Sequence, residues 1–148
     1  DANNKLNEPR EDIIIHDEFQ FRSFYFEVFV IRSRTLLKNE EVFDKCANKN
    51  WHGHNYEIHV TVKGEPDPDT GFIMDVRKLS TLIKEYILEK VDHRNLNVDV
   101  DFMQGKLAST EIFAKEIWKQ LEPHITGGKL FQIRLYETPR IYVDYFGA

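Results

Sequence analysis

The sequence predicts an α+β fold in which an antiparallel sheet carries two helices on one face. Three observations support this fold class. Segments with alternating apolar and polar residues, which are typical of strands, lie in both halves of the chain. Two segments with apolar residues at helical spacing lie between them. The resulting order of elements is β, β, α, α, β, β, and a chain of 148 residues is long enough to bury one core.

The first half of the chain begins with a polar segment over residues 1–12, which we expect to be a flexible tail before a single domain at 13–148. Aromatic and β-branched residues are dense from about Ile13 to Ile31 and predict the first strand region. A polar connection from Arg32 to Asn50 follows. Strict alternation then predicts a second strand over 52–63, with one face formed by His52, His54, Tyr56, Ile58, Val60 and Val62.

The second half begins with a turn at residues 64–71, which is rich in Gly, Pro and Asp. Asp75 can cap the first helix, whose apolar positions are Val76, Leu79, Leu82, Ile83, Tyr86 and Ile87. An acidic connection covers about 91–101. We expect the second helix to start near Ser109 or Thr110 and to stop at Pro123. Two strands around a turn at 138–140 complete the chain.

Two histidines at the start of the second strand are candidate metal ligands. His52 and His54 project from the same face, because alternate residues of a strand share a side. Zinc suits neutral imidazole, and catalytic zinc usually takes three protein ligands. A pair of surface histidines is the alternative interpretation.

Cys46, the only cysteine, lies a short loop before the histidine pair. Close to zinc or a protonated histidine, the pKa of its thiol would fall, and the thiolate would become available as a base or nucleophile. A single cysteine is often an inert core residue instead. The polar residues around Cys46 favour the chemical role.

Glu137 terminates the apolar face of the first C-terminal strand, after Phe131, Ile133 and Leu135. A carboxylate directed toward a core needs a partner, since burial of an unpaired charge is unfavourable. A flat ligand with adjacent N–H donors would satisfy both oxygens, as arginine does in a bidentate pair. The alternative is a glutamate that reaches water at the end of its strand.

Two further segments contain candidate residues. Asp92 precedes His93 in a loop, and a carboxylate beside an imidazole can fix its tautomer and support proton transfer. Thr110 and Glu111 stand at a helix start, where free backbone N–H groups can bind part of a ligand. A simple helix cap is the preferred interpretation of that segment.

The bulk properties limit the class of protein. A net charge of −5 argues against a nucleic-acid-binding protein, and no apolar run approaches the roughly 18 residues of a membrane span. One cysteine cannot form an internal disulfide, so we expect a reducing, cytoplasmic setting. Four strands leave open sheet edges, and we expect a homo-oligomer that covers them.

Taken in order, these motifs resemble the 6-pyruvoyl-tetrahydropterin synthase family, which includes the bacterial 6-carboxy-tetrahydropterin synthases of queuosine biosynthesis. The resemblance covers about residues 38–147. It rests on Cys46, His-Gly-His-Asn-Tyr at 52–56, Gly-Glu-Pro-Asp-Pro-Asp-Thr-Gly-Phe at 64–72, Asp-His-Arg-Asn-Leu-Asn at 92–97, Ser-Thr-Glu at 109–111 and Tyr-Glu-Thr at 136–138.

The resemblance implies a tunnelling fold (T-fold), in which ββααββ subunits form trimers or hexamers with active sites between subunits. It implies a Zn²⁺ ion held by His52 and His54, and proton transfer by Cys46 on one side and by Asp92 and His93 on the other. It also implies that Glu137 anchors a pterin ring in a pocket lined by Thr110 and Glu111.

The first strand departs from the family pattern. The family has a zinc-binding histidine there, whereas this chain reads Ser-Phe-Tyr-Phe-Glu-Val-Phe-Val at 23–30. Counting back from Cys46 without gaps puts Glu27 at that place, and glutamate can bind zinc. We therefore interpret Glu27 as a third ligand, unless a gap breaks the match.

The activity implied by the resemblance is a zinc-dependent lyase reaction on 7,8-dihydroneopterin triphosphate. The pyruvoyl product is favoured by the spacing between Cys46 and the histidines and by the sequence of residues 52–56, and the carboxy product is the alternative. A pterin-binding protein without catalysis is a second alternative, which the missing histidine motivates. A structural zinc site is less consistent with the open ligand set.

Overall fold

The computed structural model describes the backbone of residues 24–35 and 52–148, and the side chains of residues 53–148. The predicted strand region before Phe24 and the connection that carries Cys46 lie outside these residues. The elements in chain order are β1 Phe24–Thr35, β2 His52–Lys63, α2 Val76–Ile83, the π-helix η2 Lys84–Leu88, α3 Glu89–Val91, β3 Arg94–Asn95, the 3₁₀ helix η3 Asp101–Met103, α4 Thr110–Leu121, the 3₁₀ helix η4 Glu122–His124, β4 Lys129–Thr138 and β5 Ile141–Tyr145.

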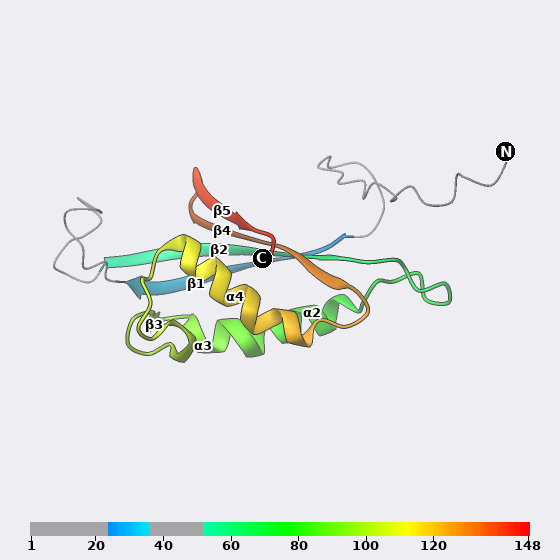
Figure 1. The fold of residues 1–148 in the computed structure, drawn as a ribbon, viewed down its shortest axis with the longest axis horizontal. Coiled ribbons are helices and arrows are strands. Elements are labelled where there is room, and N and C mark those ends of the chain that lie inside the picture. The colour runs from blue at the N-terminus through cyan, green and yellow to red at the C-terminus, as the bar shows by residue number, and fades with distance from the viewer. Residues whose placement is uncertain (1–23, 36–51) are drawn as a thin grey trace, which may run out of the picture.

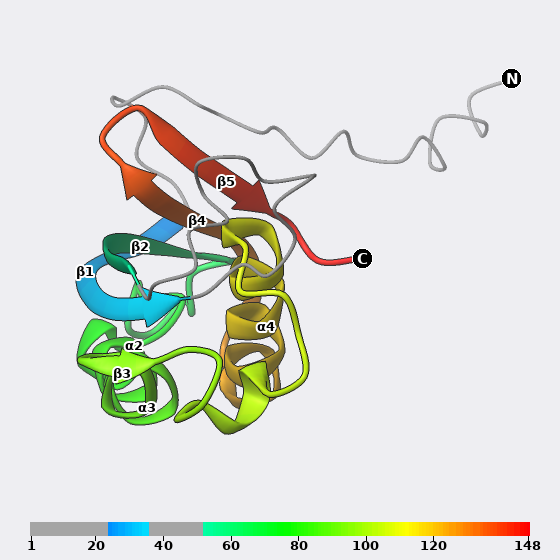
Figure 2. The same cartoon turned by 90° about the vertical axis from the view of Figure 1, so that its left-hand side faces the viewer.

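The strands form one sheet in the order β3-β1-β2-β4-β5. All neighbouring strands are antiparallel except β3, which pairs parallel to β1. Helices α2, α3 and α4 lie side by side on one face of the sheet (Figures 1 and 2). The predicted α+β class with two helical segments on one face is therefore confirmed.

Two details of the sheet differ from the sequence prediction. β1 continues to Thr35, beyond the predicted end at Ile31, because every residue from Phe24 to Thr35 has a partner on β2. The two-residue strand β3 was not predicted, since two residues are too few to show a period.

The predicted helix starts are confirmed by their caps. The Asp75 carboxylate accepts a hydrogen bond from the Arg77 backbone N–H at 2.8 Å. The Ser109 hydroxyl accepts one from the Ile112 backbone N–H at 3.3 Å. Each cap satisfies a backbone donor that the first turn of a helix leaves unpaired. The second cap fixes where α4 begins, and hence where Thr110 and Glu111 lie.

The core lies between the sheet and the helices. It contains the predicted apolar face of β2, with Tyr56, Ile58, Val60 and Val62 all buried. The facing residues on the helices and β4 are Leu79, Ile83, Ile87, Phe113, Ile117, Leu121, Ile133 and Leu135. Burial of these side chains is the main stabilising contribution to the fold. In the part of the chain that the structure describes, no helix is long and apolar enough to cross a membrane.

Candidate functional site

Three elements bring polar side chains together at one end of the sheet: the start of β2, the end of β4 and the first turn of α4. Glu137 stands at the centre of this cluster. Its Oε1 lies 3.3 Å from Nδ1 of His54, and its Oε2 accepts a hydrogen bond of 2.8 Å from the Thr110 hydroxyl. One carboxylate thus joins a predicted metal ligand to a predicted pocket residue.

A β-bulge sets the position of Glu137. Tyr136 pairs with Tyr142 of β5, whereas Thr138 pairs with Ile141, so residue 137 has no partner of its own in this pair of strands. A bulge bends the strand locally and re-aims a side chain, and bulges are frequent next to active sites. The Glu137 side chain is 26% exposed, which leaves it accessible to a ligand while its two oxygens are already directed.

Tyr56 forms the buried floor of the cluster. Its ring lies 5.4 Å from the His54 ring and packs edge-on against Phe113 at 5.3 Å. Burial is the main cause that raises the pKa of the Tyr56 phenol, and the negative charge of Glu137 raises it further. The Thr110 hydroxyl lowers this pKa, and the charge of Glu111 adds a smaller rise. The phenol is therefore held neutral. The role of Tyr56 was not predicted from the sequence, although it shares a face with both histidines.

Glu111 lies beside the cluster rather than within it. It is exposed at the second position of α4, where the partial positive charge of the helix end favours a carboxylate. Its charge contributes the smallest part of the rise in the Tyr56 pKa. Thr110, in contrast, is buried with 6% exposure and contacts Glu137 directly.

Asp92 and His93 form the predicted pair. His93 Nδ1 lies 3.0 Å from Asp92 Oδ2, and the His93 side chain is 70% exposed. His93 has a φ of 57°, a value unusual for a residue other than glycine. This conformation turns the chain from α3 into β3 and presents the imidazole to solvent.

The sheet aligns this pair with the histidines of β2. Arg94, next to His93, pairs with Ser33 of β1, and Ser33 pairs with His54. Neighbouring strands lie about 4.8 Å apart, so the backbone of Arg94 is about 10 Å from that of His54. Asp92 and His93 thus lie at the same end of the sheet as His54, a proximity that the sequence did not reveal.

The register of β1 does not place the backbone of Glu27 beside the histidine pair of the same chain, and its assignment as the third ligand stays a prediction. Glu27 pairs with Val60, six residues further along β2 than His54. At about 3.3 Å per residue, that separation is about 20 Å along the strand. The β1 residues opposite His52 and His54 are Thr35 and Ser33.

His52 and His54 supply two of the protein ligands that a zinc site needs. His52 and His54 occupy alternate positions of β2, which is the arrangement that lets two imidazoles share one ion. The side chain of His52 and the whole of Cys46 lie outside the described residues. Among the residues whose side chains the structure describes, no group of three His, Cys, Asp or Glu stands ready to hold a metal ion.

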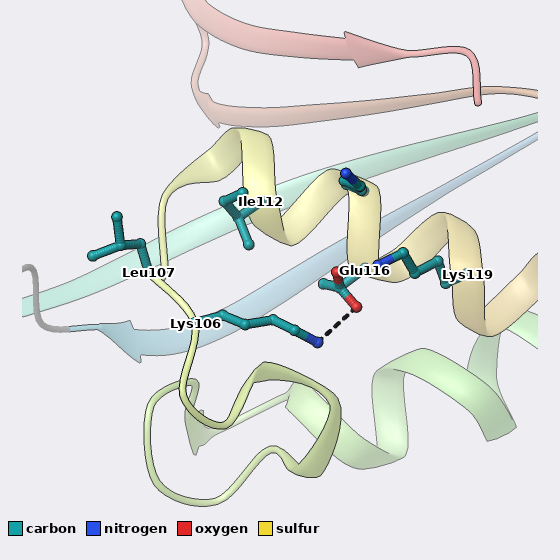
Figure 3. A pocket seen from close by; sticks show the side chains of 6 residues that line it. Lys106, Leu107, Ile112, Glu116 and Lys119 are labelled. Atoms are coloured by element: carbon teal, nitrogen blue, oxygen red, sulfur yellow. Dashed lines mark hydrogen bonds and ion pairs between the residues drawn. The ribbon is translucent and has the colours of Figure 1, made fainter. Parts of the chain in front are cut away.

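A separate groove of about 280 Å³ is formed by α4 and the segment before it (Figure 3). Lys106, Leu107, Glu116 and Lys119 are among the residues that line it. Glu116 is buried and accepts hydrogen bonds from Lys106 at 2.9 Å and from Lys119 at 2.7 Å. Because both oxygens are satisfied, we interpret Glu116 as a structural residue that ties the segment before α4 to the helix.

Comparisons with known protein families and with individual proteins point to the same family. The family model described as 6-pyruvoyl tetrahydropterin synthase matches residues 25–148. The 6-pyruvoyl tetrahydrobiopterin synthases of Pongo abelii and Homo sapiens are 41% and 40% identical over 110 residues, which is 74% of this chain and 76% of each relative. The 6-carboxy-5,6,7,8-tetrahydropterin synthase of Bacillus subtilis is 30% identical over 101 residues, 64% of this chain and 66% of that protein.

Solved structures agree with the sequence comparison. The Caenorhabditis elegans 6-pyruvoyl tetrahydropterin synthase superposes with a TM-score of 0.79 and 31% identity, over 87% of this chain and all of that one. The Plasmodium falciparum 6-pyruvoyl tetrahydropterin synthase has a TM-score of 0.60 and 17% identity, over 85% of this chain and all of that one, and this likeness concerns the fold alone.

Proposed function

Because this chain belongs to the 6-pyruvoyl tetrahydropterin synthase family, we propose that it is a zinc-dependent lyase. The proposed reaction converts 7,8-dihydroneopterin triphosphate to 6-pyruvoyl-tetrahydropterin and releases triphosphate. The observation that carries the proposal is the Glu137 carboxylate, which lies between His54 and Thr110 at the accessible end of the sheet. Relatives named for the pyruvoyl product match with higher identity than the relative named for the carboxy product.

Glu137 would anchor the pterin ring. The ring presents two adjacent N–H donors, and a carboxylate accepts such a pair in the bidentate manner that it uses for arginine. The hydrogen bond from Thr110 and the contact with His54 hold the carboxylate before the ligand arrives. A ring held in one orientation keeps the side chain of the substrate in reach of the reacting groups, which is a large part of what positioning contributes to a rate.

His52 and His54 would hold the Zn²⁺ ion. When bound, zinc supplies a Lewis acid that acidifies neighbouring hydroxyl and C–H groups of the substrate side chain. Both histidines stand on the face of β2 that also carries Tyr56, so a metal there would be close to the ring anchor.

Cys46 and the Asp92–His93 pair would move the protons. The Cys46 thiolate would take a proton from one side of the substrate side chain. The His93 imidazole would exchange a second proton on its other side. Asp92 accepts a hydrogen bond from Nδ1 of His93 in the tautomer that carries its proton there, which leaves Nε2 as the basic nitrogen. The conversion needs no external reductant, because the ring gains the electrons that the side chain loses.

Homo-oligomerisation, as a trimer or hexamer, is part of the proposal. Strand β5 is an outer strand of the sheet, and it exposes Ile141 by 57% and Tyr142 by 48%, with Phe146 beyond it at 50%. An apolar edge strand favours pairing with another chain. A cytoplasmic location remains a prediction from the single cysteine.

The test is to incubate zinc-loaded protein with 7,8-dihydroneopterin triphosphate and to identify the products by mass spectrometry. We expect triphosphate and a product with the mass of 6-pyruvoyl-tetrahydropterin. A product with the mass of 6-carboxy-tetrahydropterin would assign the chain to the second branch. Intact substrate, together with binding of a pterin, would replace the lyase by a pterin-binding protein without catalysis, an alternative that the distant position of Glu27 favours.

One variant, with a control, tests the assignment of roles in the same assay. Cys46→Ala should abolish turnover and retain zinc, because the proposal makes the thiol a proton carrier and not a metal ligand. Loss of zinc from Cys46→Ala would contradict that role. His59→Ala is the matched control for the histidines, since His59 lies on the opposite face of β2 and contacts Glu57 at 2.6 Å.

A further inference from the structure

The groove formed by α4 and the segment before it has no part in the proposed reaction, and its lining combines apolar and basic side chains. Leu107 is 53% exposed, and Ile112 is partly buried. Figure 3 shows the Leu107 side chain pointing away from the ion pair of Lys106 with Glu116. The volume of about 280 Å³ is below the range of typical small-molecule sites, about 300–1,000 Å³. It suits one or two side chains of a peptide segment.

The groove is positively charged, although the chain as a whole is not. Lys106, Lys115 and Lys119 line it together with Glu116, so positive charge is in excess there. The whole chain, in contrast, has a net charge of −5. The aliphatic stems of lysines extend an apolar surface while their ammonium groups stay in water at its edge. A complementary occupant therefore presents apolar side chains flanked by carboxylates.

Residues 11–19 of this chain, Glu-Asp-Ile-Ile-Ile-His-Asp-Glu-Phe, have that composition. They contain four carboxylates and four apolar side chains, and neither Lys nor Arg. In an extended segment alternate side chains share a face. One face of this segment would present Glu11, Ile13, Ile15, Asp17 and Phe19. On that face two isoleucines lie between two carboxylates, which is the pattern that the groove requires.

The length of chain between this segment and the first described strand is sufficient. Helix α4 runs from the end of the sheet where β1 ends toward the end where β1 begins (Figure 1). Its 12 residues span about 18 Å. Ile13 precedes Phe24, the first residue of β1, by 11 positions, and an extended chain of that length covers about 36 Å. The segment can therefore reach along the whole helix.

We propose that residues 11–19 bind in an extended form to the groove of the same chain. The two isoleucines of the face described above pack against Leu107 and Ile112, and its two carboxylates approach the groove lysines. Since the segment is tethered, its effective concentration at the groove is in the millimolar range for a short linker, and weak contacts suffice. The groove is thus a docking surface for an acidic, apolar segment of the chain itself, independent of any metal or pterin.

The experiment is carbodiimide cross-linking of the full-length protein, which joins a carboxylate directly to a contacting lysine. Mass spectrometry of the digested protein measures the yield of links between residues 11–19 and the three groove lysines. The Lys106–Glu116 pair, whose atoms lie 2.9 Å apart, is the internal standard. Lys84, which is exposed on η2 outside the groove, reports random links. A denaturing gel separates links within one chain from links between two chains.

Each variant has a matched control. On the segment, Ile15→Ser removes an apolar side chain from the proposed binding face, whereas Ile14→Ser changes the opposite face. In the groove, Leu107→Ser removes an exposed apolar side chain, and Val98→Ser removes another, 58% exposed, that does not line the groove. Because Leu107 and Val98 are both exposed, neither change should unfold the protein, and thermal unfolding checks this for all four variants.

The expected result is a loss confined to one face. Ile15→Ser and Leu107→Ser should each lower the yield of links by about tenfold, the change in an equilibrium constant that burial of such a side chain produces. Both controls should stay within about twofold of the wild type. Asp17→Lys should also lower the yield, since it opposes Lys115. Its combination with Lys115→Glu should restore docking through a link between positions 17 and 115.

Three results would overturn the proposal. Links to the groove lysines that are no more frequent than links to Lys84 would show that the segment does not dock there. Equal losses in Ile15→Ser and Ile14→Ser would show that no single face of the segment binds. A linked product with the mass of two chains would put a second copy of the chain in the groove instead. These results leave the proposed lyase reaction untouched, because the experiment contains neither zinc nor pterin.

Discussion

Replacement of Glu137 by glutamine tests the anchor most directly. The variant keeps the size of the side chain and removes its charge. A glutamine has one acceptor oxygen, and its NH₂ group must face either Thr110 or the donors of the ring. Thr110 already directs a donor at Oε2, at 2.8 Å. At least one hydrogen bond to the ring is therefore lost or replaced by a contact between two donors.

The magnitude follows from the charge and the exposure of the site. A hydrogen bond to a charged group contributes about 1.5–3 kcal/mol, which corresponds to about 10- to 150-fold in Kd. The carboxylate is 26% exposed, and solvent weakens such interactions. We therefore expect the lower part of this range, about 10- to 50-fold.

The assay is a fluorescence titration of neopterin with metal-free Glu137→Gln protein, so that ring binding is separated from the metal. Glu57→Gln is the matched control, because Glu57 points to the opposite face of the sheet and its side chain is 46% exposed. The melting temperature of Glu137→Gln should equal or exceed that of the wild type, since a partly buried charge is removed. Binding within about twofold of the wild type would refute the reasoning, because the lost hydrogen bond requires at least tenfold.

The remaining predictions concern the metal, the core and the response to acid. His54→Ala should lower the zinc content measured by mass spectrometry after dialysis, and unchanged zinc would remove His54 from the ligand set. Ile58→Ala should reduce the free energy of unfolding by about 2–5 kcal/mol in urea titrations, because Ile58 is fully buried in the central strand β2. The exposed Ile141→Ala should change it little, and equal losses would contradict the position of the core. Although burial acts to raise the pKa of Glu116, hydrogen bonds from Lys119 and Lys106 lower it below its ordinary value. The Glu116 carboxylate therefore stabilises the fold at any pH above its ordinary pKa. This stabilisation is lost as the pH falls through the lowered pKa of the folded protein. Glu116→Gln should reduce the loss of stability at acid pH. An unchanged dependence of stability on pH would show that the contacts of Glu116 with Lys106 and Lys119 contribute nothing.

The local features of the fold were predictable because they depend on residues close in sequence. Alternation along 52–63 predicted which side of β2 is buried, and Tyr56, Ile58, Val60 and Val62 are all in the core. Asp75 and Ser109 predicted two helix starts through their side-chain acceptors, and both caps are formed. The same alternation put Glu137 at the end of an apolar face and both histidines on one side.

The arrangement of the site depended on contacts between distant residues. The bulge that re-aims Glu137 exists only because β5 pairs with β4 in a shifted register. The contact of Thr110 with Glu137 joins residues 27 positions apart. Glu27 illustrates the difference, because counting along the sequence put it at the metal, whereas the pairing of β1 with β2 puts its backbone opposite Val60.

The sequence by itself therefore determined which residues face the core, where the helices start and which side chains are able to do the chemistry. Only the tertiary structure decided which of those side chains meet. The physical reason is that side-chain direction follows the short period of a strand or helix, whereas strand register is set by pairing and packing between segments far apart in the chain.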